Sequence, residues 1–211
     1  MIEFELSGRS GLFTDPITRM GGEKCSYAVP THEALRGVCR AIFWKPTFDW
    51  FIDAVRVLSP IVTRSQGVLG RKLDGGTFLG AWTYLVQPRY QVRAHFEWNM
   101  QRSDMATDRD TGKHQSQTVR HLERGGTRDV FIGVRDCQGY VRSCRFGDGL
   151  GHFDRRADDQ SGVVDLGRMF HSYSYPNQNG TGRLRRYFWN VSMVDGVISF
   201  PRAEQCDQEA L

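Results

Sequence analysis

The order in which strand-like and helix-like segments follow one another is the feature that most constrains the fold of this chain. Residues 2–6 alternate apolar and acidic side chains, which predicts a strand with one wet face. Thr31 is placed to cap a helix that ends before Pro46, and a second helical segment spans residues 113–124. The other strand-like runs are residues 50–62, 84–98 and 128–134. Strand, helix, strand, strand, helix, strand is the order of a ferredoxin-like α+β domain of the RRM type, which we therefore predict.

The chain changes character after about residue 147. Two strand-like runs flank Asp195-Gly196, a dipeptide that favours a tight hairpin. We therefore predict a ferredoxin-like domain over residues 1–146 and a small C-terminal antiparallel β-sheet over residues 147–211. Residues 8–30 are rich in Gly, Pro and Ser and are expected to form a long hairpin or a functional loop, and Gly67 to Gly80 a glycine-rich insert between two strands.

The charge composition favours a nucleic-acid partner. Only four of the 28 basic residues are lysines, and 12% of the residues are aromatic. Guanidinium groups bind phosphate bidentately and stack on bases, so this bias favours RNA binding. An arginine-rich, GC-rich genome would produce the same bias, so composition alone leaves both explanations open.

The cysteines and the first residues bear on the compartment. The five cysteines are odd in number and form no CxxC motif, which fits a reduced set. The segment that begins the chain carries Glu3 and Glu5 where a signal peptide would be basic and then apolar, and no apolar run approaches about 18 residues. We expect a cytoplasmic protein that does not associate with membranes.

Two groups of potential metal ligands occur, and neither has a fitting pattern. The gap between the two cysteines of the first group is not that of a zinc knuckle, and the second group lacks the Gly and Glu of a calcium loop. The groups are Cys137 and Cys144 with His121 or His152, and Asp104, Asp108 and Asp110. Since phosphate-binding glycine loops and the nucleophile elbow are also missing from the sequence, we expect neither a metal nor a cofactor.

Lys113-His114 is the strongest candidate for chemistry. RNA can be cleaved without a metal when one group removes the 2′-hydroxyl proton and another neutralises charge on the phosphate. Histidine suits the first role and lysine the second, and the start of a helix adds partial positive charge. A solvated pair of side chains on a helix surface is the alternative. Three arginines and a Gly-Gly pair nearby favour a phosphate path, namely Arg120, Arg124, Arg128 and Gly125-Gly126.

Five segments, in order, resemble the fifth family of CRISPR-associated (Cas) proteins, subtype I-C (Dvulg). They are SYAVPTHEALRGV (26–38), AIFWKPTFDWFID (41–53), DTGKHQSQTVRHLERGGTRDVFIGVRDCQGYV (110–141), DLGRMFHSYSYP (165–176) and VDGVISFPRAEQC (194–206). The resemblance runs nearly from end to end. It implies a ferredoxin-like RAMP domain with a small C-terminal sheet, in agreement with the independent prediction.

The resemblance also implies a function. A member of this family cleaves the CRISPR repeat hairpin in precursor crRNA without a metal, leaving a 5′-hydroxyl and a 2′,3′-cyclic phosphate. It then stays on the 5′ handle of the crRNA as a subunit of the type I-C Cascade. The implied partners are crRNA and its precursor, the backbone and large subunits of Cascade, and target DNA through the complex.

The family's active site is similar to a Tyr, Lys, His set, and this chain departs from it at one position. The resemblance places the lysine and histidine at Lys113 and His114, but Phe43 stands where the tyrosine is expected. Phenylalanine keeps the ring and loses the hydrogen-bonding oxygen. Three explanations are open: a natural variant in which another group, such as Tyr27 or Tyr90, substitutes; a weakened enzyme; or an engineered inactivation. We expect slower cleavage, with a non-catalytic subunit that binds the 5′ handle as the alternative.

The remaining expectations concern RNA binding. Cations in or beside the matched segments are candidates for phosphate contacts: Arg19, Lys24, Lys45, Arg120, Arg124 and Arg128. Trp44 and Tyr27 are candidates for stacking on bases, with a place in the core as the alternative. A generic RNA-recognition module fits less well because its strand motif is missing, and direct binding of double-stranded DNA stays open.

Overall fold

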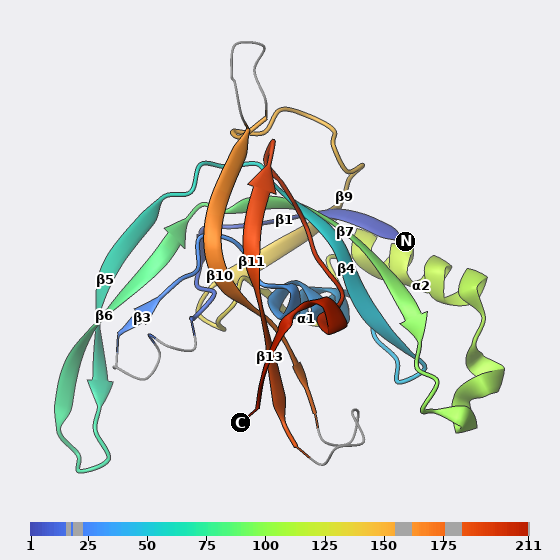
Figure 1. The fold of residues 1–211 in the computed structure, drawn as a ribbon, viewed down its shortest axis with the longest axis horizontal. Helices are drawn as coiled ribbons and strands as arrows, with labels where there is room; N and C mark the ends of the chain where they lie inside the picture. The colour runs from blue at the N-terminus through green and yellow to red at the C-terminus, as the bar shows by residue number, and fades with distance from the viewer. Residues whose placement is uncertain (16–17, 19–22, 155–161, 176–182, 211) are drawn as a thin grey trace.

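The computed structural model describes residues 1–15, 18, 23–154, 162–175 and 183–210 of the 211 residues (Figure 1). The main sheet and its two helices consist of β1 (Ile2–Gly8), α1 (His32–Ile42), β4 (Phe48–Val57), β7 (Arg89–Trp98), α2 (Thr111–Glu123), β8 (Val130–Phe131), β9 (Gln138–Ser143), β10 (Val163–Ser174), β11 (Arg185–Val194), β12 (Val197–Ser199) and β13 (Asp207–Ala210). The strand order is β10-β11-β12-β4-β7-β1-β9-β8, and β13 pairs with β11. The chain is thus a strand-rich protein that mixes helices and sheets.

Both predicted helices form, and their caps follow from the sequence. The Thr31 hydroxyl accepts a hydrogen bond from the Ala34 N–H at 3.2 Å and starts α1. The Asp110 carboxylate does the same for α2, accepting from the Lys113 N–H at 3.0 Å. After α2, Gly125 has a positive φ of 85°, a conformation that glycine adopts without strain and that ends the helix.

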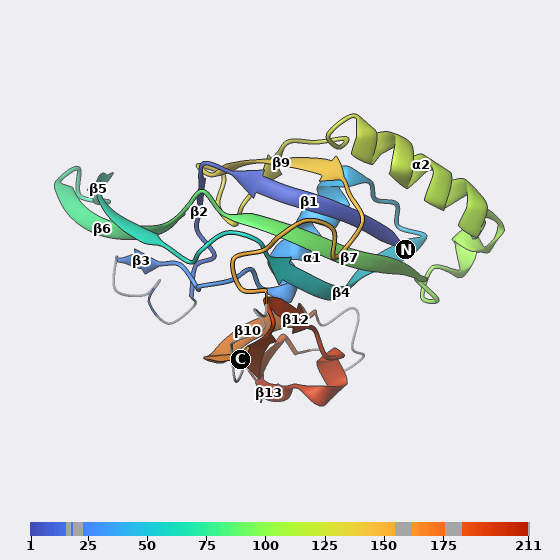
Figure 2. The same cartoon turned by 90° about the horizontal axis from the view of Figure 1, so that it is seen from above.

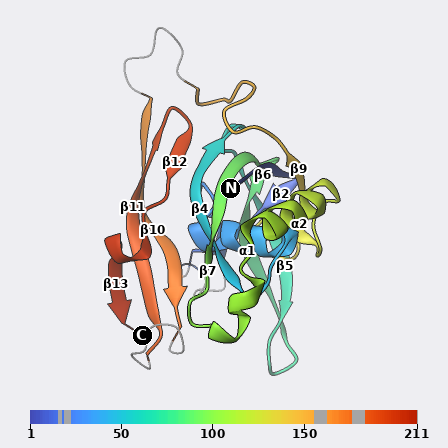
Figure 3. The ribbon, with the colours of Figure 1, turned by 90° about the vertical axis from the view of Figure 1, so that its right-hand side faces the viewer.

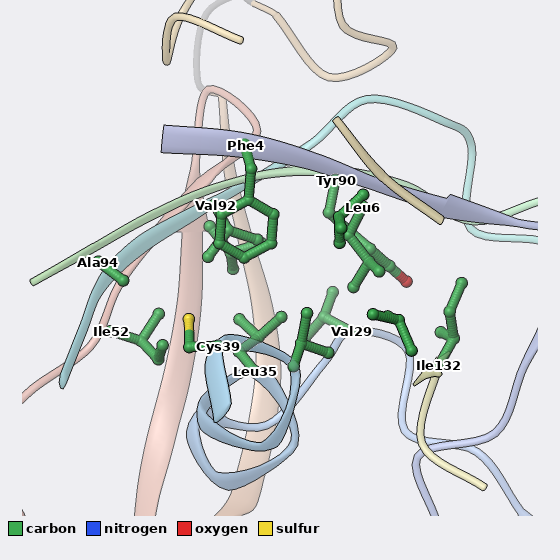
Figure 4. Close-up of a cluster of buried hydrophobic side chains, with 14 of the residues drawn as sticks. Phe4, Leu6, Val29, Leu35, Cys39, Ile52, Tyr90, Val92, Ala94 and Ile132 are labelled. Carbon is green, nitrogen blue, oxygen red and sulfur yellow. The ribbon is translucent and has the colours of Figure 1, made fainter. Parts of the chain in front are cut away.

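The core lies between α1 and the middle of the main sheet. Figure 4 shows Phe4 and Leu6 of β1 facing Leu35 and Cys39 of α1, and all four side chains are fully buried. Ile2, Phe4 and Leu6 share one face because alternate residues of a strand point to the same side. Burial of a leucine or phenylalanine contributes about 1.5–3 kcal/mol, so this contact fixes α1 against the sheet.

The strand at the edge of this core is not the one that the sequence predicts. We expect a strand over residues 128–134, but only Val130–Phe131 is extended, as β8. The strand that pairs with β1 is instead β9, with Phe4 opposite Ser143 and Gly8 opposite Gly139. The apolar 128–134 run is buried at Val130 and Ile132 without forming a long ladder. Its hydrophobicity therefore reflects packing of a loop.

The predicted glycine-rich insert is a second β-structure. β5 (Thr63–Arg71) and β6 (Thr77–Val86) form a long antiparallel hairpin, joined by the short strands β2 (Ser10–Gly11) and β3 (Lys24–Cys25) on β6. The predicted strand 84–98 is accordingly interrupted at Gln87 and Pro88, between β6 and β7. Figures 1 and 2 show this hairpin projecting from the main sheet at the end opposite to α2. Its strands are mostly exposed, so the apolar alternation expected of a strand is weak there.

The C-terminal strands do not form a sheet of their own. The predicted turn at Asp195-Gly196 is confirmed, with positive φ values of 48° and 78°. However, β12 pairs with β4 through Val197–Arg56, Ile198–Val55 and Ser199–Ala54, which joins the C-terminal strands to the main sheet. In Figure 3 β10, β11 and β13 form a layer beside β4 and β7. No helix in the described part of the chain is long and apolar enough to cross a membrane.

A stacked pair of buried histidines joins α1 to this C-terminal layer. The rings of His32 on α1 and His171 on β10 lie 4.3 Å apart with an angle of 14° between their planes. Burial lowers the pKa of His32 well below its usual value, and burial also lowers the pKa of His171 to about 4. Both rings are therefore neutral at pH 7, and charging them disfavours the folded state.

We expect the protein to lose stability as the pH falls from about 6.5 to about 4. An unfolded histidine takes up its proton near pH 6.5, whereas His171 in the folded chain does so only near pH 4. Between these values the unfolded state binds more protons, so the free energy of unfolding falls with pH, by roughly 3 kcal/mol for His171. Urea midpoints at about pH 7.5 and about pH 4 measure this loss. His171→Gln should reduce it, whereas the control His152→Gln, which keeps the stack, should not; equal losses in all three proteins would contradict the assignment.

Candidate functional site

Lys113 and His114 lie in the first turn of α2, as expected, but in different surroundings. The Lys113 side chain is 44% exposed, whereas that of His114 is completely buried. Four aromatic rings surround the imidazole, with centroid distances of 5.3 Å to Phe48, 5.7 Å to Trp98 and 6.3 Å to both Phe96 and Phe43. The ammonium group is therefore available to a ligand, and the imidazole is held in a preformed aromatic pocket beneath it.

Asp108 connects the groups of this site. It ends the 3-10 helix η2 (Ser103–Asp108), and its carboxylate lies 2.5 Å from Lys113 Nζ and 3.5 Å from Lys45 Nζ. The Thr47 hydroxyl donates to the same carboxylate at 2.9 Å. The hydrogen bond from Lys113, then that from Thr47, and the charge of Lys45 lower the pKa of Asp108 far below its usual range. The carboxylate is thus a permanent anion between two lysines.

The protonation of His114 follows from its hydrogen bonds. Nε2 lies 2.6 Å from the Asp108 backbone oxygen, and a carbonyl oxygen only accepts, so Nε2 carries a proton. Nδ1 has no partner among the described residues and is buried. A buried polar atom without a partner is costly, which makes Nδ1 the atom best placed to exchange a hydrogen bond with an added group. The imidazole is fully buried, and Asp108 at the end of η2 contacts its Nε2 atom.

Phe43 belongs to the same cluster. It is the C-cap of α1, is 6% exposed, and lies 6.3 Å from His114 and 5.2 Å from His121, ring centroid to ring centroid. Of the two following residues, Trp44 is 43% exposed, and Lys45 pairs with Asp108. The structure therefore brings Phe43, Lys45, Lys113 and His114 together from two distant segments.

The residues of the predicted phosphate path along α2 are of two kinds: exposed arginines, and glycines that shape the backbone. Arg120, Arg124 and Arg128 are exposed. Gly126 has a φ of 112°, and a Cβ added at this position would lie only 3.1 Å from the Ala41 oxygen, so the position favours glycine. Gly125 and Gly126 thus end α2 and dock it against the end of α1. Their direct role is to hold the Phe43 and Lys113 segments together.

The other predicted residues lie elsewhere. Lys24 places its ammonium 3.8 Å from the centroid of the Trp82 ring, in the hairpin sheet. The Tyr27 hydroxyl accepts from the Phe170 N–H and donates to Asp15, and burial raises its pKa to about 12. Tyr90 is a core residue, 2% exposed. Neither tyrosine contacts Lys113 or His114 in the interactions described, so the idea that one of them replaces the missing phenol loses support. Arg19 lies outside the described residues.

Asp108 is the functional candidate that the sequence analysis missed. In the sequence, Asp108 is noted only as one of three acidic residues in a loop that does not fit a calcium site. Its position between Lys45 and Lys113 depends on the contact of η2 with the segment between α1 and β4, which no local pattern encodes. Among the described residues, no group of three His, Cys, Asp or Glu side chains is arranged to hold a metal ion, so neither set of candidate ligands converges.

Comparison with known families decides which family this arrangement belongs to. The family model Cas_Cas5d, described as CRISPR-associated protein (Cas_Cas5), matches residues 1–201. The chain belongs to the Cas5d family. The resemblance noted in the sequence is thereby confirmed, and every segment that carries the candidate site lies inside the match.

Known Cas5d proteins and CRISPR structures agree with this assignment. A relative from Mannheimia succiniciproducens, named CRISPR pre-crRNA endoribonuclease Cas5d, is 27% identical over 95% of this chain and 94% of its own length. A crystal structure of a CRISPR-associated protein is 32% identical, with a TM-score of 0.77 over 98% of this chain and 94% of that chain. A chain of a CRISPR RNA-guided surveillance complex shares the fold, with a TM-score of 0.54 and 13% identity over 99% of this chain and 89% of that chain.

Proposed function

We propose that this chain is a pre-crRNA endoribonuclease that cleaves the CRISPR repeat hairpin and keeps the 5′ handle as a subunit of the type I-C Cascade. The observation that carries the proposal is the convergence of Lys113, His114 and Phe43 around the Asp108 carboxylate. These residues come from segments about 70 positions apart, and all lie within the region matched by the Cas5d family.

The chemistry that suits these groups is attack of a 2′-hydroxyl on the adjacent phosphate. His114 transfers the proton of the attacking 2′-hydroxyl, and Lys113 stabilises the charge on the five-coordinate phosphorus. The products are a 5′-hydroxyl and a 2′,3′-cyclic phosphate. The reaction needs no metal. His114 is fully buried and its Nε2 atom contacts Asp108 at the end of η2, so the groups around the imidazole must move before it reaches the RNA. None of the η2 side chains is buried, and its attachment depends largely on Asp108, so an arriving phosphate that replaces this carboxylate on Lys113 also releases η2.

The fold proposed with this function is a ferredoxin-like RAMP domain over residues 1–146, followed by a C-terminal region over residues 147–211. It is supported by the order β4-β7-β1-β9, in which every neighbouring pair is antiparallel and α1 and α2 occupy the two crossover connections. Exposed Arg120, Arg124 and Arg128 continue the phosphate path from Lys113. The backbone and large subunits of Cascade, and target DNA through the complex, are the proposed partners, and the cytoplasm the proposed location.

Incubation with the repeat RNA of the host's own CRISPR array, in EDTA, tests the activity. We expect one specific cut within the repeat, a 2′,3′-cyclic phosphate on the upstream product, and no cleavage of a scrambled hairpin. A denaturing gel with and without phosphatase treatment resolves the products. Cleavage that requires magnesium would contradict the mechanism.

One observation favours a second function, a handle-binding subunit that does not cleave. Phe43 provides no hydroxyl at the position of the family's tyrosine, although its ring lies beside His114. In that case the repeat RNA binds tightly, the scrambled hairpin binds weakly, and neither is cut.

A further inference from the structure

A cavity of about 540 Å³ lies at the root of the β5–β6 hairpin, apart from the candidate cleavage site. Here β6 runs between β2 and β5, with Ser10 opposite Val86 on one side and Arg64 opposite Tyr84 on the other. The lining residues come from all three strands and from the segments that follow β1 and β6. The cavity therefore lies where the hairpin joins the main sheet; Figure 2 shows how the β5 and β6 ribbons leave the sheet there.

The wall of this cavity carries two arginines without a counter-charge. Arg9 and Arg64 are exposed and line the cavity, and neither makes an ion pair with a described residue. By contrast, Arg56 and Arg89 nearby in the fold are paired with carboxylates. Asp136 is the one carboxylate among the described residues of the wall, so the lining has a net positive charge. Two free guanidinium groups in one cavity are suited to phosphate.

The backbone at Gln87 provides an independent observation. Gln87 lines the cavity with a positive φ of 46°, a conformation uncommon for any residue but glycine or asparagine. The following residue is Pro88, which further disfavours conformations outside the extended region. The Gln87 N–H donates to the Arg9 oxygen at 3.0 Å and fixes this geometry. A residue held under strain at a cavity points to a use for its side chain.

The remaining lining residues fit a nucleobase. Tyr84 is half-buried and presents an aromatic ring, and the side-chain amides of Gln66 and Gln87 can both donate and accept hydrogen bonds. Aromatic rings bind unpaired bases by stacking, and glutamine amides recognise base edges. We propose that this cavity binds one nucleotide of the RNA, with Arg9 and Arg64 on the phosphate and Tyr84, Gln66 and Gln87 on the base. The inference rests on the proposed function only in taking RNA as the ligand.

This nucleotide site is distinct from the cleavage site. At one end of β1, the Gln115 amide donates to the Met1 oxygen at 2.6 Å, one residue from His114. At the other end, Arg9 follows β1 directly. Eight residues of extended chain separate Met1 from Arg9, which corresponds to about 26 Å. The cavity therefore holds a part of the RNA remote from the scissile phosphate and fixes its register along the sheet.

Fluorescence anisotropy with 5′-labelled repeat RNA tests the two arginines. We expect Arg9→Ala/Arg64→Ala to weaken binding by about tenfold and to reduce the slope of log K against log salt by about 0.7, the value for one neutralised phosphate of a single strand. The control Lys72→Ala/Arg145→Ala removes the same charge outside the cavity and should change the affinity less than twofold. Equal weakening in both proteins would overturn the proposal, since it would mean diffuse attraction.

The Gln87→Gly variant distinguishes an effect on RNA binding from an effect on folding stability. Glycine adopts a positive φ without strain, so the thermal unfolding midpoint should stay the same or rise, while the affinity for the repeat RNA falls at least threefold. Unchanged affinity of this variant together with the Arg9/Arg64 variant would refute the site. If the unaltered protein binds no repeat RNA at all, the proposed function fails; if it binds and the variants bind equally well, only this inference fails.

Discussion

His114→Ala abolishes measurable cleavage of the repeat RNA, with a rate loss of about 10²- to 10⁴-fold, while RNA binding is largely retained. This is the loss typical of removing a group that transfers a proton in the transition state. The imidazole is completely buried, so it contributes little to the surface that a bound RNA first meets. Single-turnover rates at saturating protein, together with dissociation constants, measure the two effects separately.

The Lys113→Ala variant tests whether a folding defect, and not the loss of a catalytic group, explains the result for His114→Ala. The Lys113 side chain is 44% exposed, so its removal leaves the core intact, and we expect a rate loss close to that of the histidine variant. Ser116→Ala, an exposed change on the same helix, is the matched control and should cleave at the normal rate. Full activity of the His114 variant would place the chemistry elsewhere, and cleavage of a substrate with a 2′-deoxy nucleotide at the cut would exclude the 2′-hydroxyl as nucleophile.

Phe43→Tyr raises the single-turnover rate by about 10- to 1000-fold and changes RNA affinity little. A hydroxyl that bonds a group whose charge changes in the transition state affects the rate more than ground-state binding. The added oxygen enters a cluster in which His114 Nδ1 is buried without a partner among the described residues, and the Phe43 ring already lies beside that imidazole. The same single-turnover assay on the repeat RNA provides the measurement.

Two further variants make the Phe43 result specific. Phe43→Leu keeps an apolar side chain without the ring, so it shows how much the stacking on His121 contributes. Tyr27→Phe removes the phenol that bonds Asp15 and the Phe170 N–H, and it should leave the rate unchanged. A tyrosine variant that cuts no faster than the unaltered protein would mean that another residue has taken the role, or that the chain binds the handle without cleaving.

The features that the sequence predicts well are those set by local chemistry. The predicted cap of α1, Thr31, lies three residues from the N–H group that it satisfies; the second helix is predicted from residue 113, and it begins at Thr111 behind the Asp110 cap, which is not predicted. The turn at Asp195-Gly196 needs positive φ at two successive residues, which this dipeptide tolerates. Lys113 and His114 are neighbours in the chain, so their proximity needs no tertiary structure.

The features that sequence analysis misses depend on long-range contacts. The β5–β6 hairpin is solvated on most of its surface, so its strands lack the alternation that marks a half-buried strand. The pairing of β12 with β4 joins residues about 140 positions apart and places the C-terminal strands in the main sheet. Asp108 becomes part of the site only because η2 lies against the segment between α1 and β4, where the Thr47 hydroxyl and Lys45 contact it.

In the proposed function, the position of Asp108 makes RNA binding at this site an exchange of anions. The two ammonium groups already share an internal counter-ion, which the low pKa of Asp108 keeps charged at any pH the cell reaches. An incoming phosphate therefore competes with a tethered carboxylate, and Lys45 and Lys113 attract random polyanions less than two free lysines would. A phosphate displaces the carboxylate only when other contacts of the RNA already hold that phosphate near the lysines, because those contacts raise its local concentration. The Asp108 carboxylate thus favours a substrate that is bound along its whole length over an RNA that contacts only the two lysines.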